Sequence, residues 1–248
     1  MSGHSKWAGI KHKKAVIDAK KGKVFSKIVR EINVACKEGG PNPDDNPRLR
    51  LVIQKAKQFN MPSDNIKRAL AKSAESSVNY ESVHYEGYGP GGAAVMVEAQ
   101  TDNRNRTTQE IKNIFSGHGG NCGEVGCVAW MFSKKGCILA SSEAGEEKVM
   151  EAAVSAGADD INETDNGFEV YTTPDNFEKV TEALKAAGIE IVSSEISNIA
   201  KTSVRLEGEK ARAMLRLMDE LESHDDVTDT SANFDIDDSE IEKFSENL

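Results

Sequence analysis

The chain has 248 residues, a hydrophobic fraction of 38%, a charged fraction of 29% and a formal net charge of −10 at pH 7. This length allows two or three domains, and no stretch approaches the roughly 20 consecutive apolar residues of a membrane span. The N-terminus lacks the apolar core of a secretory signal and the four cysteines follow no disulfide or zinc spacing, so we expect a cytoplasmic protein with reduced thiols.

The charge is divided unevenly along the chain. Residues 1–78 contain 17 Lys+Arg and 7 Asp+Glu, a balance of +10, whereas residues 79–248 contain 14 and 34, a balance of −20. A basic head can bind a polyanion while the acidic remainder is repelled from it. We therefore expect nucleic acid at the N-terminal end, and solvent or a protein partner, such as the ribosome, at the acidic part.

The first thirty residues are the most basic stretch. Only Asp18 among them is acidic, and the opening half has few large apolar residues, so we expect a mobile or loosely helical arm. Lysines at short, irregular spacing neutralise successive phosphates with little sequence preference, and a tryptophan among them can stack on an unpaired base. The predicted contacts are Lys6, Trp7, Lys11, Lys13, Lys14, Lys20, Lys21, Lys23, Lys27 and Arg30. The alternative is a solvated basic tail.

Hydrophobic periodicity predicts three short helices before residue 78. The first covers residues 22–40 and ends at a glycine pair, the second begins after an Asn46 cap, and Ser63 caps the third. Their apolar faces predict a three-helix bundle with a basic exterior. Arg48 and Arg50, on the second helix, join the predicted nucleic-acid contacts.

The pattern changes to strands at Tyr80. Two strands joined by a hairpin at Gly89–Gly92 precede a helix opened by TDNRNRT, and a further strand is expected at Val128–Phe132. After an intervening segment, a strand, a helix and a further strand are expected over residues 203–234. We expect residues 79–132 and 204–248 to form one discontinuous α+β domain.

An internal repeat lies between these two segments. Residues 147–157 recur 31 positions later as residues 178–188, and each copy reads as a helix that ends at a glycine. Each follows one predicted strand and leads into another, so the segment reads as βαβ twice. We expect an inserted ferredoxin-like βαββαβ domain over residues 133–203, giving an α+β fold overall. Chance similarity between two amphipathic helices is the alternative.

Arg104 and Arg106 lie at a predicted helix N-terminus, where the helix dipole disfavours cations. This placement is tolerated when the side chains reach an acidic neighbour or an anionic ligand. The two arginines are therefore either a second anion contact or part of a structural salt bridge.

Other candidate sites are weaker. His118, Cys122 and Cys127 match no zinc spacing, and the acidic run at residues 235–238 lacks the glycine and terminal glutamate of a calcium loop, which favours a solvated acidic tail. His84 is the one central histidine and is expected to be packed in a strand. We expect no metal, no cofactor and no enzymatic activity, because no nucleophile with an adjacent base is evident.

Several long motifs carry a family resemblance. GHSKWAGIKHKKAVIDAKKGKVFSKIVREI, NPRLRLVIQKAK, NMPSDNIKRA, YEGYGPGG, TDNRNRT and GGNCGEVGCVAWMFSKKG together resemble the YebC family, the bacterial and organellar group that includes the mitochondrial translational activator of cytochrome oxidase. The resemblance covers almost the whole chain. It implies three domains, of which the first is helical, and a DNA-binding transcriptional regulator. Family members are also implicated in translation on ribosomes that elongate slowly through proline-rich stretches.

The resemblance also adds to the expected site. The family's basic N-terminal motif corresponds here to Lys6, Trp7, Lys11, His12, Lys13, Lys14, Lys20, Lys21 and Lys23, which adds His12 to the predicted contacts. Gly9 replaces a common Asn, which weakens any claim of a polar contact there. Cys122 and Cys127 stand where Leu and Ser are frequent, which further weakens a metal site.

The residues and the resemblance together predict a non-enzymatic, nucleic-acid-binding regulator of gene expression. In one version the arm binds duplex DNA and regulates transcription. In the other it binds ribosomal or transfer RNA and assists translation. No recognition helix with clear base-reading side chains is evident, which favours RNA, whereas the family resemblance favours DNA.

Overall fold

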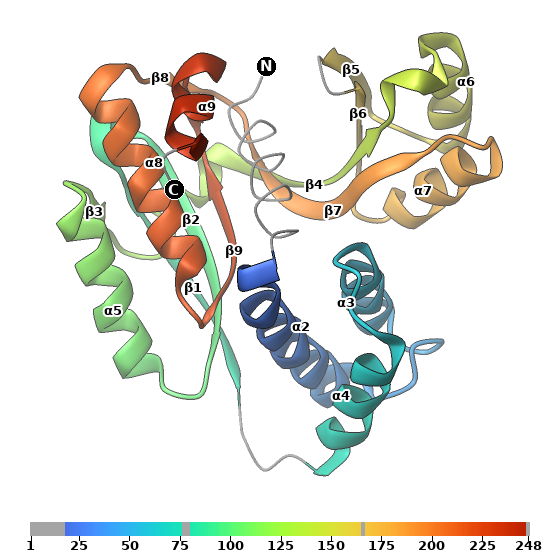
Figure 1. Cartoon of the computed structure of the whole chain (residues 1–248), viewed down its shortest axis with the longest axis horizontal. Helices are drawn as coiled ribbons and strands as arrows, with labels where there is room; N and C mark the ends of the chain where they lie inside the picture. The colour runs from blue at the N-terminus through green and yellow to red at the C-terminus, as the bar shows by residue number, and fades with distance from the viewer. Residues whose placement is uncertain (1–17, 76–79, 165–166, 247–248) are drawn as a thin grey trace. The chain divides into compact units, whose positions relative to one another are not determined.

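The computed structural model describes residues 18–75, 80–164 and 167–246 (Figure 1). It is a mixed structure of helices and antiparallel sheets, and the expected α+β class is confirmed. Contacts divide it into an insert unit, residues 132–199, and a main unit that contains the described parts of residues 2–131 and 200–248. None of the described helices has the length and apolar character that crossing a bilayer requires.

The main unit begins with three helices, as the periodicity predicts: α2 (Asp18–Gly39), α3 (Pro47–Gln58) and α4 (Ser63–Glu75). Asn46 caps α3 by accepting a hydrogen bond from the Leu49 N–H at 3.0 Å. Its amide also donates to the carbonyls of Ala35 and Gly40, both at 2.8 Å, so one buried side chain connects the end of α2 to the start of α3. Ile28, Ile32 and Leu49 are central in the shared core.

The rest of the main unit is a sheet with helices packed on one face. Its elements are β1 (Glu81–Tyr88), η1 (Pro90–Gly92), β2 (Ala94–Thr101), α5 (Arg104–Gly117), β3 (Asn121–Cys122), η2 (Ala129–Met131), β8 (Val204–Arg205), α8 (Gly208–Ser223), β9 (Val227–Ala232), β10 (Phe234–Asp235) and α9 (Asp238–Glu246). The strand order of the larger sheet is β3-β1-β2-β9. Helices α5 and α8 lie side by side against it (Figure 1), and Phe115 and Leu215 fill the space between.

Two local expectations for this region are wrong. Val128–Phe132 is not a strand, because residues 129–131 form a 3-10 turn and the next strand begins at Phe132. The acidic C-terminal segment is not a solvated tail: it contains α9, and Ile236 and Ile241 are buried in the main core. Arg205 pairs with Asp235 and Asp237, both at 3.3 Å, which offsets part of the negative charge.

The insert unit has the element order that the repeat predicts. Its elements are β4 (Phe132–Ala140), η3 (Ser142–Ala144), α6 (Glu146–Ala156), β5 (Asp160–Thr164), β6 (Gly167–Thr172), α7 (Phe177–Ala186) and β7 (Ile191–Ala200). The described strands are ordered β5-β6-β4-β7, so the two central strands are the first and third, as in a ferredoxin-like βαββαβ domain. The domain boundaries at residues 78, 132 and 203 stay a prediction.

Candidate nucleic-acid interface

The predicted contacts fall into three groups. Lys6, Trp7, Lys11, His12, Lys13 and Lys14 lie outside the described residues. Lys20 and Lys21 belong to α2, but their side chains also lie outside the description. The structure places the side chains of Lys23, Lys27, Arg30, Arg48 and Arg50.

Lys23 and Lys27 lie one turn apart on α2 and contact the end of α8. The Lys27 ammonium donates to the Glu222 carbonyl at 2.5 Å, and that of Lys23 donates to the Ser223 carbonyl at 3.5 Å. Carbonyls in the last turn of a helix have no partner within the helix and carry the negative end of its dipole. These two lysines therefore cap α8 and attach α2 to it.

Arg30, one turn further along α2, reaches Asp226 in the turn between α8 and β9. The distance from its guanidinium to the Asp226 carboxylate is 3.0 Å, and the Asp226 side chain is only 8% exposed. Arg106 of α5 pairs with the same carboxylate at 2.9 Å, and the Thr107 hydroxyl donates to it at 2.7 Å. Asp226 thus connects α2, α5 and the α8–β9 turn.

The protonation of Asp226 follows from these neighbours. Burial alone would raise the pKa of its carboxyl, but the hydrogen bonds from Thr107 and Arg106 and the charge of Arg30 outweigh burial and lower the pKa. The hydrogen bond and the charge of Asp226 in turn raise the pKa of Arg106, with Asp102 contributing further. Arg106 is therefore part of a structural ion-pair network, while Arg104 is exposed at the start of α5.

Glu110, His224 and Asp226 are the described residues whose ligand atoms come together at metal-like spacing. The Asp226 N–H donates to His224 Nδ1 at 3.1 Å, so the neutral ring carries its proton on Nε2, which faces Glu110 at 2.9 Å. Two guanidinium groups already contact Asp226 and would repel a cation. This cluster is an ion-pair and hydrogen-bond network that fixes the turn.

The loop that contains Cys122 and Cys127 is fixed by Glu86. Glu86 is a buried carboxylate on β1 that accepts hydrogen bonds from the N–H groups of Gly126, Val128 and Ala129 at 2.7–2.8 Å. His118, at the start of the loop, pairs instead with Glu220 at 2.5 Å. Burial alone would raise the pKa of Glu86, but these three donors outweigh it and lower the pKa. The sequence pattern of β1 gave no signal of this role.

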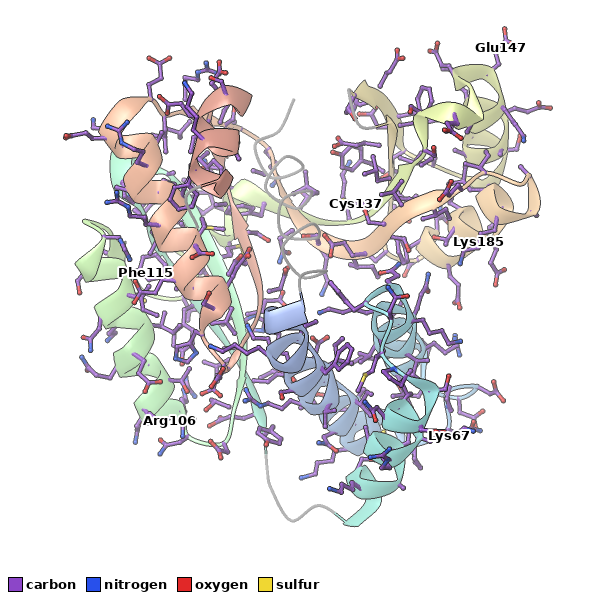
Figure 2. All side chains as sticks on the ribbon, viewed as in Figure 1. Lys67, Arg106, Phe115, Cys137, Glu147 and Lys185 are labelled. Atoms are coloured by element: carbon purple, nitrogen blue, oxygen red, sulfur yellow. The ribbon has the colours of Figure 1, made fainter. Side chains whose placement is uncertain are left out.

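Arg48 and Arg50 also have partners within the chain. Arg48 pairs with Glu38 at the end of α2, and Arg50 donates to the carbonyls of Pro43 and Asp44, both at 3.0 Å. They attach the start of α3 to the preceding loop and helix. The basic side chains of α4 are different: Lys67, which Figure 2 marks, is exposed, as are Arg68 and Lys72.

Two surface depressions lie in the insert unit. One is on residues 145–151, and the other is between α6 and α7. Lysine, glutamate and alanine side chains line them, together with Ser155.

The chain matches two family models, described as "TACO1/YebC protein N-terminal domain" over residues 5–76 and "TACO1/YebC second and third domain" over residues 80–234. It is 54% identical to a probable transcriptional regulatory protein of Trichlorobacter lovleyi, covering 98% of this chain and 99% of that protein. A relative of the same description from Dictyoglomus turgidum is 50% identical, with coverages of 99% and 100%.

A solved structure is also similar. The crystal structure of a conserved hypothetical protein, Aq1575 from Aquifex aeolicus, matches with a TM-score of 0.80 and 44% sequence identity, covering 89% of this chain and 93% of that one. The family models and the relatives together span nearly the whole sequence. The chain therefore belongs to the TACO1/YebC family.

Proposed function

We propose that this protein is a cytoplasmic regulator of gene expression that binds nucleic acid through its basic N-terminal arm and helical region, without catalysing a reaction. The observation that carries the proposal is the charge division, +10 over residues 1–78 against −20 over residues 79–248. A polyanion is attracted to the first part and repelled by the second. The N-terminal part is therefore the part expected to bind nucleic acid.

The contacts of α2 support a role for the arm. Lys23, Lys27 and Arg30 attach α2 to the end of α8 and to the α8–β9 turn, so the helix that follows the arm in the sequence is fixed to the α+β part of the main unit. The lysines at positions 6–14 precede this helix. In the proposed arrangement they bind phosphates while the α+β part of the main unit, from residue 80 onward, and the insert unit remain available to a protein partner.

Duplex DNA is the first candidate ligand, because the relatives are named probable transcriptional regulatory proteins. RNA on the ribosome is the second candidate, because no recognition helix with adenine-reading amides is evident among the described helices of the N-terminal region. The exposed side chains that the structure describes on α4 are Lys, Arg, small and acidic residues, and its one amide, Asn65, is only partly exposed. Lys and Arg on such a surface bind the phosphate backbone that DNA and RNA share.

Sedimentation of the tagged, full-length protein from gently lysed cells tests the proposal and separates the two ligands. Migration with ribosomal particles that is lost after RNase treatment supports the translation candidate. Migration with chromosomal fragments that is lost after DNase supports the transcription candidate. A protein that stays at the top of the gradient in all conditions, and that fails to shift duplex DNA or RNA in gels, would contradict the proposal.

A further inference from the structure

We propose that the outer face of α4, formed by Lys67, Arg68 and Lys72, is a phosphate-contact surface of the helical region. The inference rests on the proposed function, and it moves the helical region's contact from α2 and the start of α3 to a different helix. The ligand is the phosphodiester backbone that DNA and RNA share.

The packing of α4 determines which side chains are available. Ile66 and Ala69 are 7% and 3% exposed and face the core that α4 shares with α2. Lys67, Arg68 and Lys72 occupy the opposite, exposed side, and Figure 2 marks Lys67 there. Arg68 and Lys72 are four residues apart and lie on the same face of the helix, and Lys67 lies beside Arg68, about 100° around the axis, still on the exposed side.

The second observation is the contrast with the other basic residues. Lys23 and Lys27 bind the end of α8, Arg30 binds the α8–β9 turn, and Arg48 and Arg50 bind groups of the helical region itself. A phosphate must displace these internal partners before it can bind those side chains. By contrast, no hydrogen bond or ion pair joins Lys67, Arg68 or Lys72 to another residue within the described ranges. Their donors are available to an anion at no such cost.

The surroundings of α4 also differ from those of other exposed lysines. Asp64 is the one exposed acidic group among the α4 side chains that the structure describes. In the insert unit, Lys148 lies between Glu147 and Glu151, and Lys179 follows Glu178. A phosphate backbone is therefore attracted to α4 and repelled from the lysines of the insert unit.

The spacing on α4 suits a phosphate chain. Lys67 and Lys72 are separated by about 7.5 Å along the helix axis, at 1.5 Å per residue. Phosphates of one strand of duplex DNA recur about every 3.4 Å along its axis. The three cations are thus within reach of two or three successive phosphates.

The test compares two triple variants of the full-length protein. The first carries Lys67→Ala, Arg68→Ala and Lys72→Ala, which removes the α4 cations and retains helix propensity. The matched control carries Lys148→Ala, Lys179→Ala and Lys185→Ala, which changes net charge equally on exposed helices of the insert unit. Both are titrated onto a short duplex DNA and onto a single-stranded RNA of equal length, at several salt concentrations, and thermal melts verify that each is folded.

The α4 variant is expected to bind every sequence more weakly, and its slope of log affinity against log salt should fall by about two to three units on duplex DNA, at about 0.9 per lost phosphate contact. The control should keep the wild-type slope. Wild-type slopes in the α4 variant on both probes would overturn this inference alone. If the wild-type protein itself shows no salt-dependent binding, the proposed function fails, and the inference fails with it.

Discussion

At the scale of single residues, Asp226 is the point on which the charges of the main unit converge. It is nearly buried and accepts from Arg30, Arg106 and Thr107, which come from two different helices. Removing one partner of such a cluster leaves the other charges desolvated without compensation. Asp226 is thus the residue whose loss should weaken the attachment of α2 most.

Asp226→Asn should lower the free energy of unfolding by about 2–3 kcal/mol, somewhat less than for fully buried pairs because Arg106 is about half exposed. Urea denaturation of the full-length protein measures this loss. Asp225→Asn is the matched control, since that side chain is 67% exposed and its ion pair with Lys23 is long, at 3.9 Å. Equal losses in the two variants would show that the buried network does not stabilise the fold.

The lowered pKa of Asp226 predicts a pH dependence. The unfolded chain takes up this proton at a higher pH than the folded chain does, so the stabilisation is complete above the ordinary value of 3.8 and is lost as pH falls through the lower, folded-state pKa. The difference in unfolding free energy between wild type and Asp226→Asn should therefore shrink as pH falls below about 4. A difference that stays constant from pH 7 to pH 3 would contradict this assignment.

Glu86 makes a second residue-scale prediction. Glu86→Gln replaces a carboxylate that accepts three backbone N–H groups with an amide that has one acceptor oxygen. We expect a loss of about 2–3 kcal/mol and faster hydrogen exchange at Gly126, Val128 and Ala129. Glu124→Gln, an exposed change in the same loop, is the control and should alter neither quantity. Unchanged exchange in Glu86→Gln would mean that the loop is fixed in another way.

At the scale of elements, helix caps, glycine stops and the internal repeat predicted the helices and strands correctly wherever no distant residue changed the local structure. The Asn46 cap, the Pro47 start and the glycine pair at the end of α2 predicted the helical region, and the repeat predicted the βαββαβ element order of the insert unit. Residues 129–131 were misread because Glu86, more than forty positions earlier in the chain, binds their loop. Nothing in a local apolar run reveals such a partner.

The acidic end was misread for a similar reason. Its charge indicated a solvated tail, but Ile236 and Ile241 are buried and β10 pairs with β8 in parallel, with Phe234 opposite Val204. Likewise, the sequence placed Arg106 correctly at a helix N-terminus without revealing Asp226, 120 positions away, as its partner. The sequence could therefore identify the basic residues of the candidate site, but it could not show which of them form ion pairs or hydrogen bonds within the folded chain.

Ile241→Ala tests whether α9 is an integral part of the main core. Ile241 is 2% exposed and belongs to the core cluster, so the truncation should cost about 2–4 kcal/mol through lost burial and a residual cavity. Lys243→Ala, an exposed change on the same helix, should cost about 1 kcal/mol or less, because exposed polar and charged contacts contribute little. Denaturation midpoints compare the two, and an Ile241→Ala variant as stable as Lys243→Ala would show that α9 contributes little to the fold.

At the scale of the whole molecule, the dominant feature is the uneven distribution of charge, +10 over residues 1–78 and −20 over residues 79–248. Part of the positive charge of residues 1–78 is used inside the molecule, where Lys23, Lys27 and Arg30 attach α2 to the end of α8 and to the α8–β9 turn. Arg48 and Arg50 likewise contact groups of the helical region. The lysines of the arm and the cations on the outer face of α4 are the ones proposed to bind phosphates. The proposal is therefore that one basic region has two tasks, the first five side chains stabilising the structure and the others binding phosphates.

The most direct measurement is the salt dependence of nucleic-acid binding by the full-length wild-type protein and by the arm variant Lys11→Ala, Lys13→Ala, Lys14→Ala. Affinities for duplex DNA and for RNA are measured between about 50 and 200 mM salt. The account predicts salt-dependent binding by the wild type, and in the variant a uniform weakening across sequences with a slope reduced by up to about three units. Wild-type binding that is independent of salt, or an arm variant with an unchanged slope, would contradict it.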